Sequence, residues 1–536
     1  MSRYSRQLAS GVLGRAGWSF VALLALRSSF NAADEGPSAR ALGREVSMTK
    51  HLQDDEEFRT SMPALIAHGK LLFSANWTDQ EGAGRPLSKG TGKKLADPSR
   101  PLVGLRSFNR ISGPDANACA GCHNAPYGIA GGAGDIVGNV FVLAQRIDFT
   151  TFDRKDLVPT GGSIGEDNQP VTLERIGNSR ATTHLFGAGY LEMLARQMTG
   201  ELQALRDTVR NGEAKILTAS GVGFGRIKRS QDGLWDVSEV EGLPWPSLVS
   251  HGSNDPPSLI IRPWHQAGNV VSIREFTNNA LVQHHGIQST ERFGVGTDAD
   301  GDGVRNEITR ADVTAMVLYQ ATLQVPGRVI PNDPIVEKAV KRGERTFASI
   351  GCANCHIPTL PLDQEGAIFT EPNPYNPPGN LRSGETRTIR VDLDDTGIPS
   401  PRLTVDRRRR VVDVPAYTDF KLHDITGGED EREPLDMNRA TWSPKFREGN
   451  RRFLTKRLWG VASAPNHYHH GLFTTMRRAI EAHAGEAIGA RRAYGALPIV
   501  EQDALIEFLK TLQVLPPGTK DLLVDEHFRP KQWHAE

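Results

Sequence analysis

Apolar residues recur at the spacing of an amphipathic helix in several stretches of the chain. One stretch begins at Asp333 and Pro334, which are typical of a helix N-cap and a first helical position, and it leads directly to Cys352. An earlier stretch, PALIAHGKLLF, begins at Pro63 and has a similar pattern. Both contain Gly-x-x-x-Phe, which indicates a weak internal repeat. The positions concerned are Val336, Val340, Gly343, Phe347 and Ile350 in the later stretch and Ile66, Gly69 and Phe73 in the earlier one.

Other segments predict a closing helix and long loops. Near the C-terminus, Leu505, Phe508, Leu509 and Leu512 share one apolar helical face. Residues 82–101 and 365–385 are rich in turn-forming residues, so we expect neither helix nor strand there. Residues 324–334 contain three prolines and a glycine and are the expected domain boundary. The pattern predicts a mainly α fold in which a small helical domain occurs twice, with long loop insertions.

Length and charge set broad limits. A chain of 536 residues is too long for one compact core, so two or more domains are expected. Lys and Arg together number 63, as do Asp and Glu. This balance gives no argument for nucleic acid or an anionic membrane as a partner, and we expect neither.

The N-terminal residues have the layout of a secretory signal. Arg3, Arg6 and Arg15 precede the apolar run 18–26, and small residues follow. We therefore expect residues 1–33 to be a signal peptide and the protein to be exported to the periplasm; an uncleaved anchor is the alternative. No later stretch has the length of a membrane span, so none is expected in the mature chain.

All four cysteines lie in two copies of one pattern, CAGCH and CANCH. In C-x-x-C-H the two thiols can reach the vinyl groups on one edge of a porphyrin, and the adjacent His presents its imidazole to the iron. Zinc, a disulfide and a thioredoxin-like motif are the competing interpretations. Zinc has no need for His after both pairs, and neither location shows a βαβ pattern. The sequence therefore predicts two covalent c-type haems, one at Cys119, Cys122 and His123 and one at Cys352, Cys355 and His356.

The remaining histidines decide which chemistry such a site performs, because a six-coordinate haem with firm protein ligands passes electrons whereas an open face binds peroxide or oxygen. Met476, Ile480 and His483 share one face of a helix that Thr475 can cap, so His483 is expected to be an axial ligand. The alternative for His483 is a hydrogen-bonded core histidine.

A second helix begins at Ser272, where Glu275 completes a capping box, and stops at Gly286. It carries His284, which is expected to point inward, and His285, which is expected to point sideways. Either histidine is a candidate to border a haem, and a structural hydrogen bond is the alternative. Further candidates for the first haem are His184, Tyr190 and Met193, and Glu192 is a candidate acid–base group or an ordinary surface residue.

The segment DADGDGVRNEIT resembles the first half of an oxygen-rich calcium loop, with acidic residues at alternate positions before a glycine. Thr309 stands where a bidentate Glu is expected, so Glu307 or Asp312 would supply that oxygen. We expect a structural calcium ion here, with a plain acidic turn as the alternative. The alternating residues are Asp298, Asp300 and Asp302.

With these residues in view, the chain resembles the di-haem oxidoreductase family of peroxidase-like proteins, also labelled thiol oxidoreductases, which is related to the bacterial di-haem cytochrome c peroxidases. The resemblance implies two cytochrome c-like haem domains, residues 34–325, which would contain the calcium loop, and residues 326–536. The motifs that carry it are CAGCHNAPYG, SRATTHLFGAGYLE, GVGFGRIK, SIREFTNNALVQHHGIQSTERFG, DADGDGVRNEIT, CANCHIPTL, YTDFKLHD and FLTKRLWGVASAPNHYHHGLFTTMRRAIEAHAGEA.

The resemblance also implies ligands. In the peroxidases a Phe-His-Asp-Gly turn precedes a helix whose Met ligates the C-terminal haem; residues 468–471 match that turn, and His483 falls where the Met belongs. This implies His483 as distal ligand of the Cys352/Cys355 haem and a lowered potential for that haem, while His470 departs from the usual Asp. The residues just after His123 contain no His or Met, which implies that the first haem's distal side is open or filled from afar.

The function implied is reduction of hydrogen peroxide, or another small oxidant, at the Cys119/Cys122 haem. The Cys352/Cys355 haem would receive electrons from a small donor protein, a cytochrome or cupredoxin, and Trp264 and Trp459 are candidates to lie between the irons or to be core aromatics. One alternative is a non-catalytic electron carrier in which His483 and His284 complete two six-coordinate haems. The other is haem-dependent oxidation of an organic or protein substrate.

Overall fold

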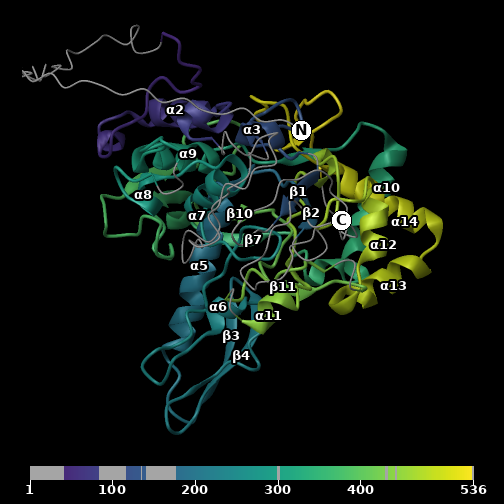
Figure 1. Cartoon of the computed structure of the whole chain (residues 1–536). Helices are drawn as coiled ribbons and strands as arrows, with labels where there is room; N and C mark the ends of the chain where they lie inside the picture. Colours follow the sequence, from purple (N-terminus) through teal and green to yellow (C-terminus); the bar gives the residue numbers. More distant parts are fainter. Residues whose placement is uncertain are drawn as a thin grey trace, which may run out of the picture. The chain divides into compact units, whose positions relative to one another are not determined.

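The computed structural model describes residues 42–83, 116–134, 136–140, 177–298, 302–428, 432–440 and 443–533. Residues Glu45–Glu536 form one compact unit, which is the unit described below (Figure 1). The other unit, Met1–Arg44, lies almost entirely outside the described residues, as does the expected signal peptide. The division at 325/326 stays a prediction.

The expectation of a mainly α protein is wrong. The structure is 34% helical and 15% strand, and the described strands form six small sheets of two or three strands each. The pairs are antiparallel except for β6 with β14. The sheets are β1 (Ile136–Val140) with β2 (Gly177–Ala181); β3 (Ala214–Ala219) with β4 (Val222–Arg229) and β5 (Trp235–Asp236); β6 (Gly327–Val329) with β13 (Leu512–Gln513) and β14 (Leu523–Val524); β7 (Leu360–Asp363) with β10 (Val411–Val414); β8 (Ile368–Glu371) with β9 (Ile389–Asp392); and β11 (Leu422–Asp424) with β12 (Arg452–Leu454).

The strands escaped recognition because most are too short to show a period. Strand β8 lies inside residues 365–385, where turn-forming residues predicted no strand, yet it pairs with β9 over four residues and buries alternate side chains. Pairing with a distant partner and burial of Phe369 stabilise this strand, and neither is visible in the local sequence.

The helices agree better with the local pattern. Asp333 caps α10, since its carboxylate accepts hydrogen bonds from the N–H groups of Ile335 (2.7 Å) and Val336 (3.2 Å). The predicted apolar face of α14 is buried through Leu505, Phe508 and Leu509. The helices are α2 (Met62–Ser74), α3 (Cys119–Cys122), α5 (Ala188–Arg206), α6 (Trp245–Leu248), α7 (Ile273–Ala280), α8 (Thr290–Phe293), α9 (Arg310–Ala321), α10 (Pro334–Ser349), α11 (Pro444–Arg447), α12 (Met476–Ala482), α13 (Ile488–Ala496) and α14 (Ile499–Thr511).

The repeated Gly-x-x-x-Phe has a structural counterpart in two helix pairs, α2 with α9 and α10 with α14, which lie side by side in Figure 1. A Cβ atom on Gly69 would lie 2.0 Å from the carbonyl oxygen of Ala315, and one on Gly343 would lie 2.0 Å from that of Ala504. Each glycine therefore allows two helix backbones to touch.

The phenylalanine of each repeat contacts the histidine of one C-x-x-C-H motif. The ring centroid of Phe73 lies 6.1 Å from that of His123. The ring centroid of Phe347 lies 6.5 Å from that of His356. In both helix pairs, therefore, the phenylalanine of the repeat lies beside the histidine of a C-x-x-C-H motif.

Replacement of Gly343 with Ala is expected to lower the free energy of unfolding by about 1–3 kcal/mol, because the new methyl group would overlap the α14 backbone. Chemical denaturation measures the change. The control is Gly495→Ala in α13, where no atom lies within 4 Å of the added Cβ, so Ala should stabilise the helix by about 0.5–1 kcal/mol. Equal stability of wild type and Gly343→Ala would contradict the close contact.

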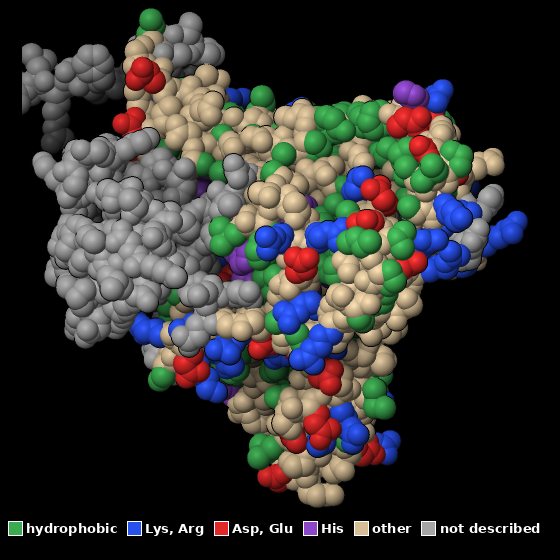
Figure 2. Space-filling view, turned by 90° about the vertical axis from the view of Figure 1, so that its right-hand side faces the viewer, with side chains coloured by type: hydrophobic (Ala, Val, Ile, Leu, Met, Phe, Trp, Pro, Cys, Tyr) green, Lys and Arg blue, Asp and Glu red, His purple; other side chains and the backbone are tan. Residues whose placement is uncertain are grey.

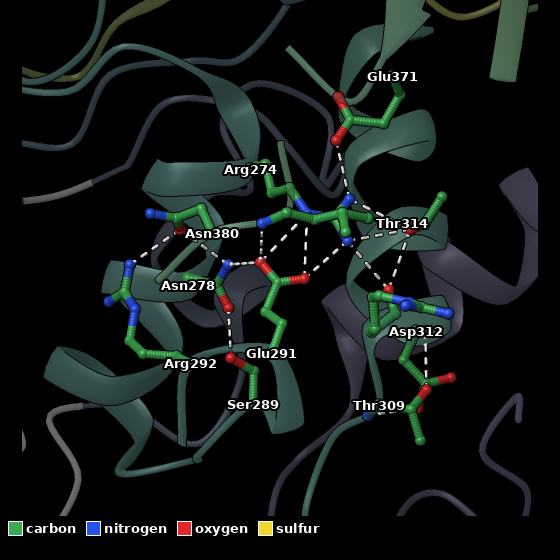
Figure 3. A network of polar contacts seen from close by, with 12 residues as sticks. Arg274, Asn278, Ser289, Glu291, Arg292, Thr309, Asp312, Thr314, Glu371 and Asn380 are labelled. Carbon is green, nitrogen blue, oxygen red and sulfur yellow. Dashed lines mark hydrogen bonds and ion pairs between the residues drawn. The ribbon is translucent and has the colours of Figure 1, made fainter. Parts of the chain in front are cut away.

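A buried ion-pair network joins α7, α8, α9 and β8 (Figure 3). Arg274 is fully buried and pairs with Glu291 at 2.7 Å and with Glu371 at 2.8 Å. It also donates to the Thr314 hydroxyl at 3.2 Å. A buried cation without such partners would be costly, so this network anchors the first turn of α7 to α8, α9 and β8.

Asp312, at the start of α9, ties the N-terminal segment to this core. Its carboxylate is fully buried and accepts hydrogen bonds from His51 Nδ1 and His68 Nε2, each at 2.7 Å. Burial alone would raise the pKa of Asp312, but the bonds from His51 and His68 outweigh burial and hold the pKa at about 2, against an ordinary 3.8. Burial would lower the pKa of His51, but Asp312 raises it above 6.5.

These shifts predict a pH window. Asp312 contributes to the free energy of unfolding above its unfolded pKa of 3.8, and this contribution is lost as the pH falls toward 2. His51 contributes below pH 6.5, and its contribution is lost as the pH rises above its folded pKa. Asp312→Asn should therefore lower the free energy of unfolding by about 2 kcal/mol near pH 5 and by less near pH 8. The control is Asp55→Asn at an exposed carboxylate. A difference in the free energy of unfolding between wild type and Asp312→Asn that does not change with pH would contradict this interpretation.

Two surface features complete the description. Among the described helices, none has the length and apolar character needed to cross a membrane. Figure 2 shows acidic and basic side chains interspersed on the face it presents, in keeping with the equal numbers of the two charges in the sequence.

Candidate haem sites

The Cys352/Cys355/His356 motif lines a cavity of about 460 Å³, which is within the ~300–1,000 Å³ typical of cofactor pockets. His356 donates from Nδ1 to the carbonyl oxygen of Tyr417 at 3.2 Å, so its Nε2 is left for the cavity. Burial, with a smaller effect of His483, lowers the pKa of His356 to about 4. His356 is therefore neutral, as a metal ligand must be.

His483 faces His356 across this cavity. The two ring centroids lie 6.4 Å apart, at an interplanar angle of 63°. Metal–imidazole bonds of ~2 Å on both sides of one ion would separate the centroids by about 6 Å. His483 donates from Nδ1 to the Ala479 carbonyl oxygen at 2.6 Å, and burial lowers its pKa. The two imidazoles have the separation that a metal bound between them requires, and each is held through Nδ1 by a backbone carbonyl oxygen.

Local sequence explains the position of His483. Thr475 caps α12, accepting from the Arg478 N–H at 3.3 Å, as the sequence predicted. The helix ends at Ala482, one residue before His483, and Gly485 follows with φ 51°. His483 therefore projects from the last turn of a short helix into the cavity.

The turn before α12 supplies two more histidines to the wall, His467 and His469. The ring of His469 stacks on Phe453, with centroids 3.7 Å apart and planes at 16°. Tyr468, with φ 72°, donates its hydroxyl to the Ile425 carbonyl oxygen at 2.8 Å. Among the histidines of this wall, His483 is the one placed opposite His356.

Donor atoms of Cys355, Asp419 and His423 lie within 4.8 Å of one another, the one such group found in the described part of the chain. His423 donates to Asp419 at 2.9 Å and to Glu486 at 2.7 Å. Burial opposes protonation, yet hydrogen bonds with Asp419 and Cys355, among others, raise the pKa of His423 to about 11. A doubly protonated imidazole has no lone pair for a metal, so this group is a hydrogen-bonded cluster.

The cysteine thiols disfavour the three competing interpretations of the motifs, which are a disulfide, a thioredoxin-like site and a zinc site. All four cysteines are free, so neither pair is a disulfide. Burial raises the pKa of Cys119 to about 12 and that of Cys352 to about 11, whereas a thioredoxin-like motif needs a lowered thiol pKa. Within the described residues, the donor atoms of neither complete C-x-x-C-H motif converge as zinc requires. The cavity, the opposed imidazoles and the thiols together fit covalently attached haem at the second motif.

The Cys119/Cys122/His123 motif lines a smaller cavity, about 110 Å³ between the described residues. His123 donates from Nδ1 to the Gly132 carbonyl oxygen at 3.1 Å, matching the bond that His356 makes to Tyr417. Burial lowers the pKa of His123 to about 4, so this imidazole is also neutral. His123 and His356 are thus both neutral, and each is held through Nδ1 by a backbone carbonyl oxygen.

Besides His123, three histidines line the first cavity: His265, His284 and His285. The helix carrying the last two continues past α7 as a π-helical turn, Leu281–His285. In this wider turn His285 is 2% exposed, donates from Nδ1 to the Ala116 carbonyl oxygen at 2.6 Å and lies 3.3 Å from Cys119 Sγ through Nε2. His284 is half-buried on the cavity wall. Both histidines border the site, since the π-turn replaces the regular α-helical spacing assumed from sequence.

The other residues singled out from the sequence lie elsewhere. Glu192 is fully buried, pairs with Arg196 and accepts from the Ile273 N–H (2.7 Å) and Asn373 Nδ2 (2.8 Å), and it lines neither C-x-x-C-H cavity. His184 donates from Nε2 to the Trp459 carbonyl oxygen at 2.9 Å. Tyr190 donates to the Leu393 carbonyl oxygen at 2.8 Å, and Met193 packs against the main core.

A third cavity of about 60 Å³, the intermediate cavity, lies between the first and second cavities. It shares wall residues with the first cavity, including His265, and shares Lys456 with the second, while Gln266 lines all three. Trp264 is one of its wall residues. The sequence analysis did not single out His265, Lys456 or Arg457. The one signal for the two cations was their adjacent position in the mostly apolar segment FLTKRLWGV.

The calcium prediction is only partly within the described residues, because Asp300 lies outside them. Asp298 accepts from the N–H groups of Asp302 (3.2 Å) and Gly303 (3.1 Å). Glu307 is buried and accepts from the Gln288 N–H at 2.7 Å. Asp312 is committed to His51 and His68. Calcium at this loop stays a prediction.

Comparisons with known proteins add little. No family model matches the chain, and no curated protein matches it. A solved structure of hydrazine synthase from Kuenenia stuttgartiensis, pressurised with xenon, matches with a TM-score of 0.33 and 11% identity over 95% of this chain and 100% of that chain. A likeness at that TM-score supports no statement about fold or function, and the peroxidase family is not shown by any of the comparisons.

Proposed function

We propose that the chain is a di-haem c-type oxidoreductase that reduces hydrogen peroxide at the Cys119/Cys122 site and receives electrons at the Cys352/Cys355 site. The observation that carries the proposal is the opposition of His356 and His483, 6.4 Å apart between ring centroids, across the cavity of the second motif. When bound, haem supplies one-electron redox chemistry and, at an open face, binding of peroxide.

The second site is suited to electron transfer. His356 and His483 offer neutral imidazoles from both sides, and each is held in orientation by a carbonyl oxygen on its other nitrogen. With His356 and His483 both offered to the group, this site would exclude substrate and supply electron transfer alone. Electrons from a small donor protein, a cytochrome or cupredoxin, would enter here and leave along the wall that contains Trp264.

The first site is suited to proton transfer. Reduction of one peroxide to two water molecules consumes two electrons and two protons, and cleavage of the O–O bond needs a proton on the departing oxygen. His284 and His285 both line the cavity, and the half-buried imidazole of His284 is the more exposed of the two. We assign delivery of that proton to His284.

The same histidine supports a second candidate function. If His284 ligates the first metal, both haems would be six-coordinate and the chain would be a non-catalytic electron carrier. The half-buried position of His284 in the first cavity favours this candidate as directly as it favours the acid–base role.

The proposal is tested first by covalent loading. Purified from a host that matures c-type cytochromes, the chain should have the mass of polypeptide plus two haems, and alkaline pyridine spectra should report thioether-linked haem. The double variant Cys352→Ala and Cys355→Ala should lose one haem and retain the other. Wild type without added mass, measured by intact mass spectrometry after export, would contradict the proposal.

A further inference from the structure

Two adjacent cations, Lys456 and Arg457, line the intermediate cavity between the candidate sites. Among the described residues, neither forms a salt bridge with a carboxylate. Arg457 donates to the His184 carbonyl oxygen, stacks on Trp264 with 5.7 Å between guanidinium carbon and ring centroid, and has a buried Nε without a hydrogen-bond partner.

Both side chains are part-buried in the walls of these cavities, so holding their charges there without a counter-charge is costly. Buried charges in proteins are nearly always paired or hydrogen-bonded, because desolvation of an isolated ion is expensive. Two unpaired cations on the walls of cavities therefore indicate that an anion belongs there.

The two cations face different sites. Lys456 lines both the intermediate cavity and the large cavity of His356, and its charge acts on His467 and His469 in that wall. Arg457 lines the intermediate cavity, and its charge acts on His123 of the first motif.

We propose that Lys456 and Arg457 are carboxylate-binding residues that pair with haem propionates, Lys456 at the Cys352/Cys355 site and Arg457 at the Cys119/Cys122 site. This inference rests on the proposed function, since the propionates are those of the two haems. A planar guanidinium suits bidentate binding of a carboxylate, and the ammonium of Lys456 suits a point contact. The pairing satisfies both cations and sets the local charge at each iron.

The test compares the reduction potentials of the two haems in wild type, Lys456→Met and Arg457→Met. Removing a cation beside a haem favours the ferric state, so Lys456→Met should lower mainly the potential of the second haem and Arg457→Met mainly that of the first. Redox-induced infrared difference spectra should show a shift of propionate carboxylate bands in each variant. Lys456→Arg keeps the charge and should restore the wild-type potential, which separates the effect from damage to folding.

Lys510→Met, at an exposed lysine paired with Glu507 on α14, is the matched control and should leave both potentials unchanged. Wild-type potentials and carboxylate bands in both variants, with two haems bound, would overturn the assignment and leave the proposed function standing. A wild-type chain without covalent haem would instead contradict the proposed function itself.

Discussion

Replacement of His483 with Met is expected to raise the reduction potential of the Cys352/Cys355 haem while keeping it low-spin, because thioether ligation favours the ferrous state more than imidazole does. Replacement with Gly should instead open one face and convert the low-spin ferric signal of this haem to high-spin. Both expectations follow from the 6.4 Å separation of the His356 and His483 rings. Redox titration and low-temperature electron paramagnetic resonance measure them.

The control for this prediction is His467→Gln, which removes another imidazole of the same cavity wall. It should retain the wild-type spectrum because the His467 ring is not the one opposite His356. A low-spin second haem in His483→Gly, or a ligand loss in His467→Gln, would show that a different residue holds the distal face.

Replacement of His284 with Gln should slow peroxide turnover about a hundredfold or more, the usual effect of losing a positioned proton donor. The expectation rests on the place of His284 in the first cavity, beside His123 and away from the second site. The spectrum of the second haem should not change. Steady-state turnover with a reduced donor protein, per haem bound, is the measurement.

Glu192→Gln is the informative comparison, since the sequence also made Glu192 a candidate acid–base group. Its carboxylate is held by Arg196, Ile273 and Asn373, so the substitution should lower stability and leave the turnover of folded protein unchanged. Wild-type turnover in His284→Gln would remove the acid–base role from His284, and a large loss confined to Glu192→Gln would transfer it to Glu192.

What the sequence predicted well was local. The caps at Asp333 and Thr475 depend on residues a few positions apart, and the repeat that contains Gly69 and Gly343 is a short pattern. Such features follow from backbone hydrogen bonding and helix packing geometry, which a single segment reveals.

What it did not predict depends on distant partners or on departures from regular spacing. The strand β7 pairs with β10 across a long connection, so a mainly α fold was expected in place of six small sheets among the described residues. The π-turn at Leu281–His285 changes which imidazole is buried, and the pairing of Arg274 with Glu371 needs the folded chain. The unpaired cations Lys456 and Arg457 have meaning only beside cavities that three-dimensional packing creates.

The central claim is one closed and one accessible haem site in the same chain. Low-temperature electron paramagnetic resonance of the fully oxidised protein, quantified against two haems per chain, tests it most directly. The account predicts one low-spin signal from the site of His356 and His483 and one high-spin signal from the site of His123 that responds to peroxide. Two low-spin signals of full intensity, unchanged after half-reduction, would contradict the account and leave an electron-transfer protein.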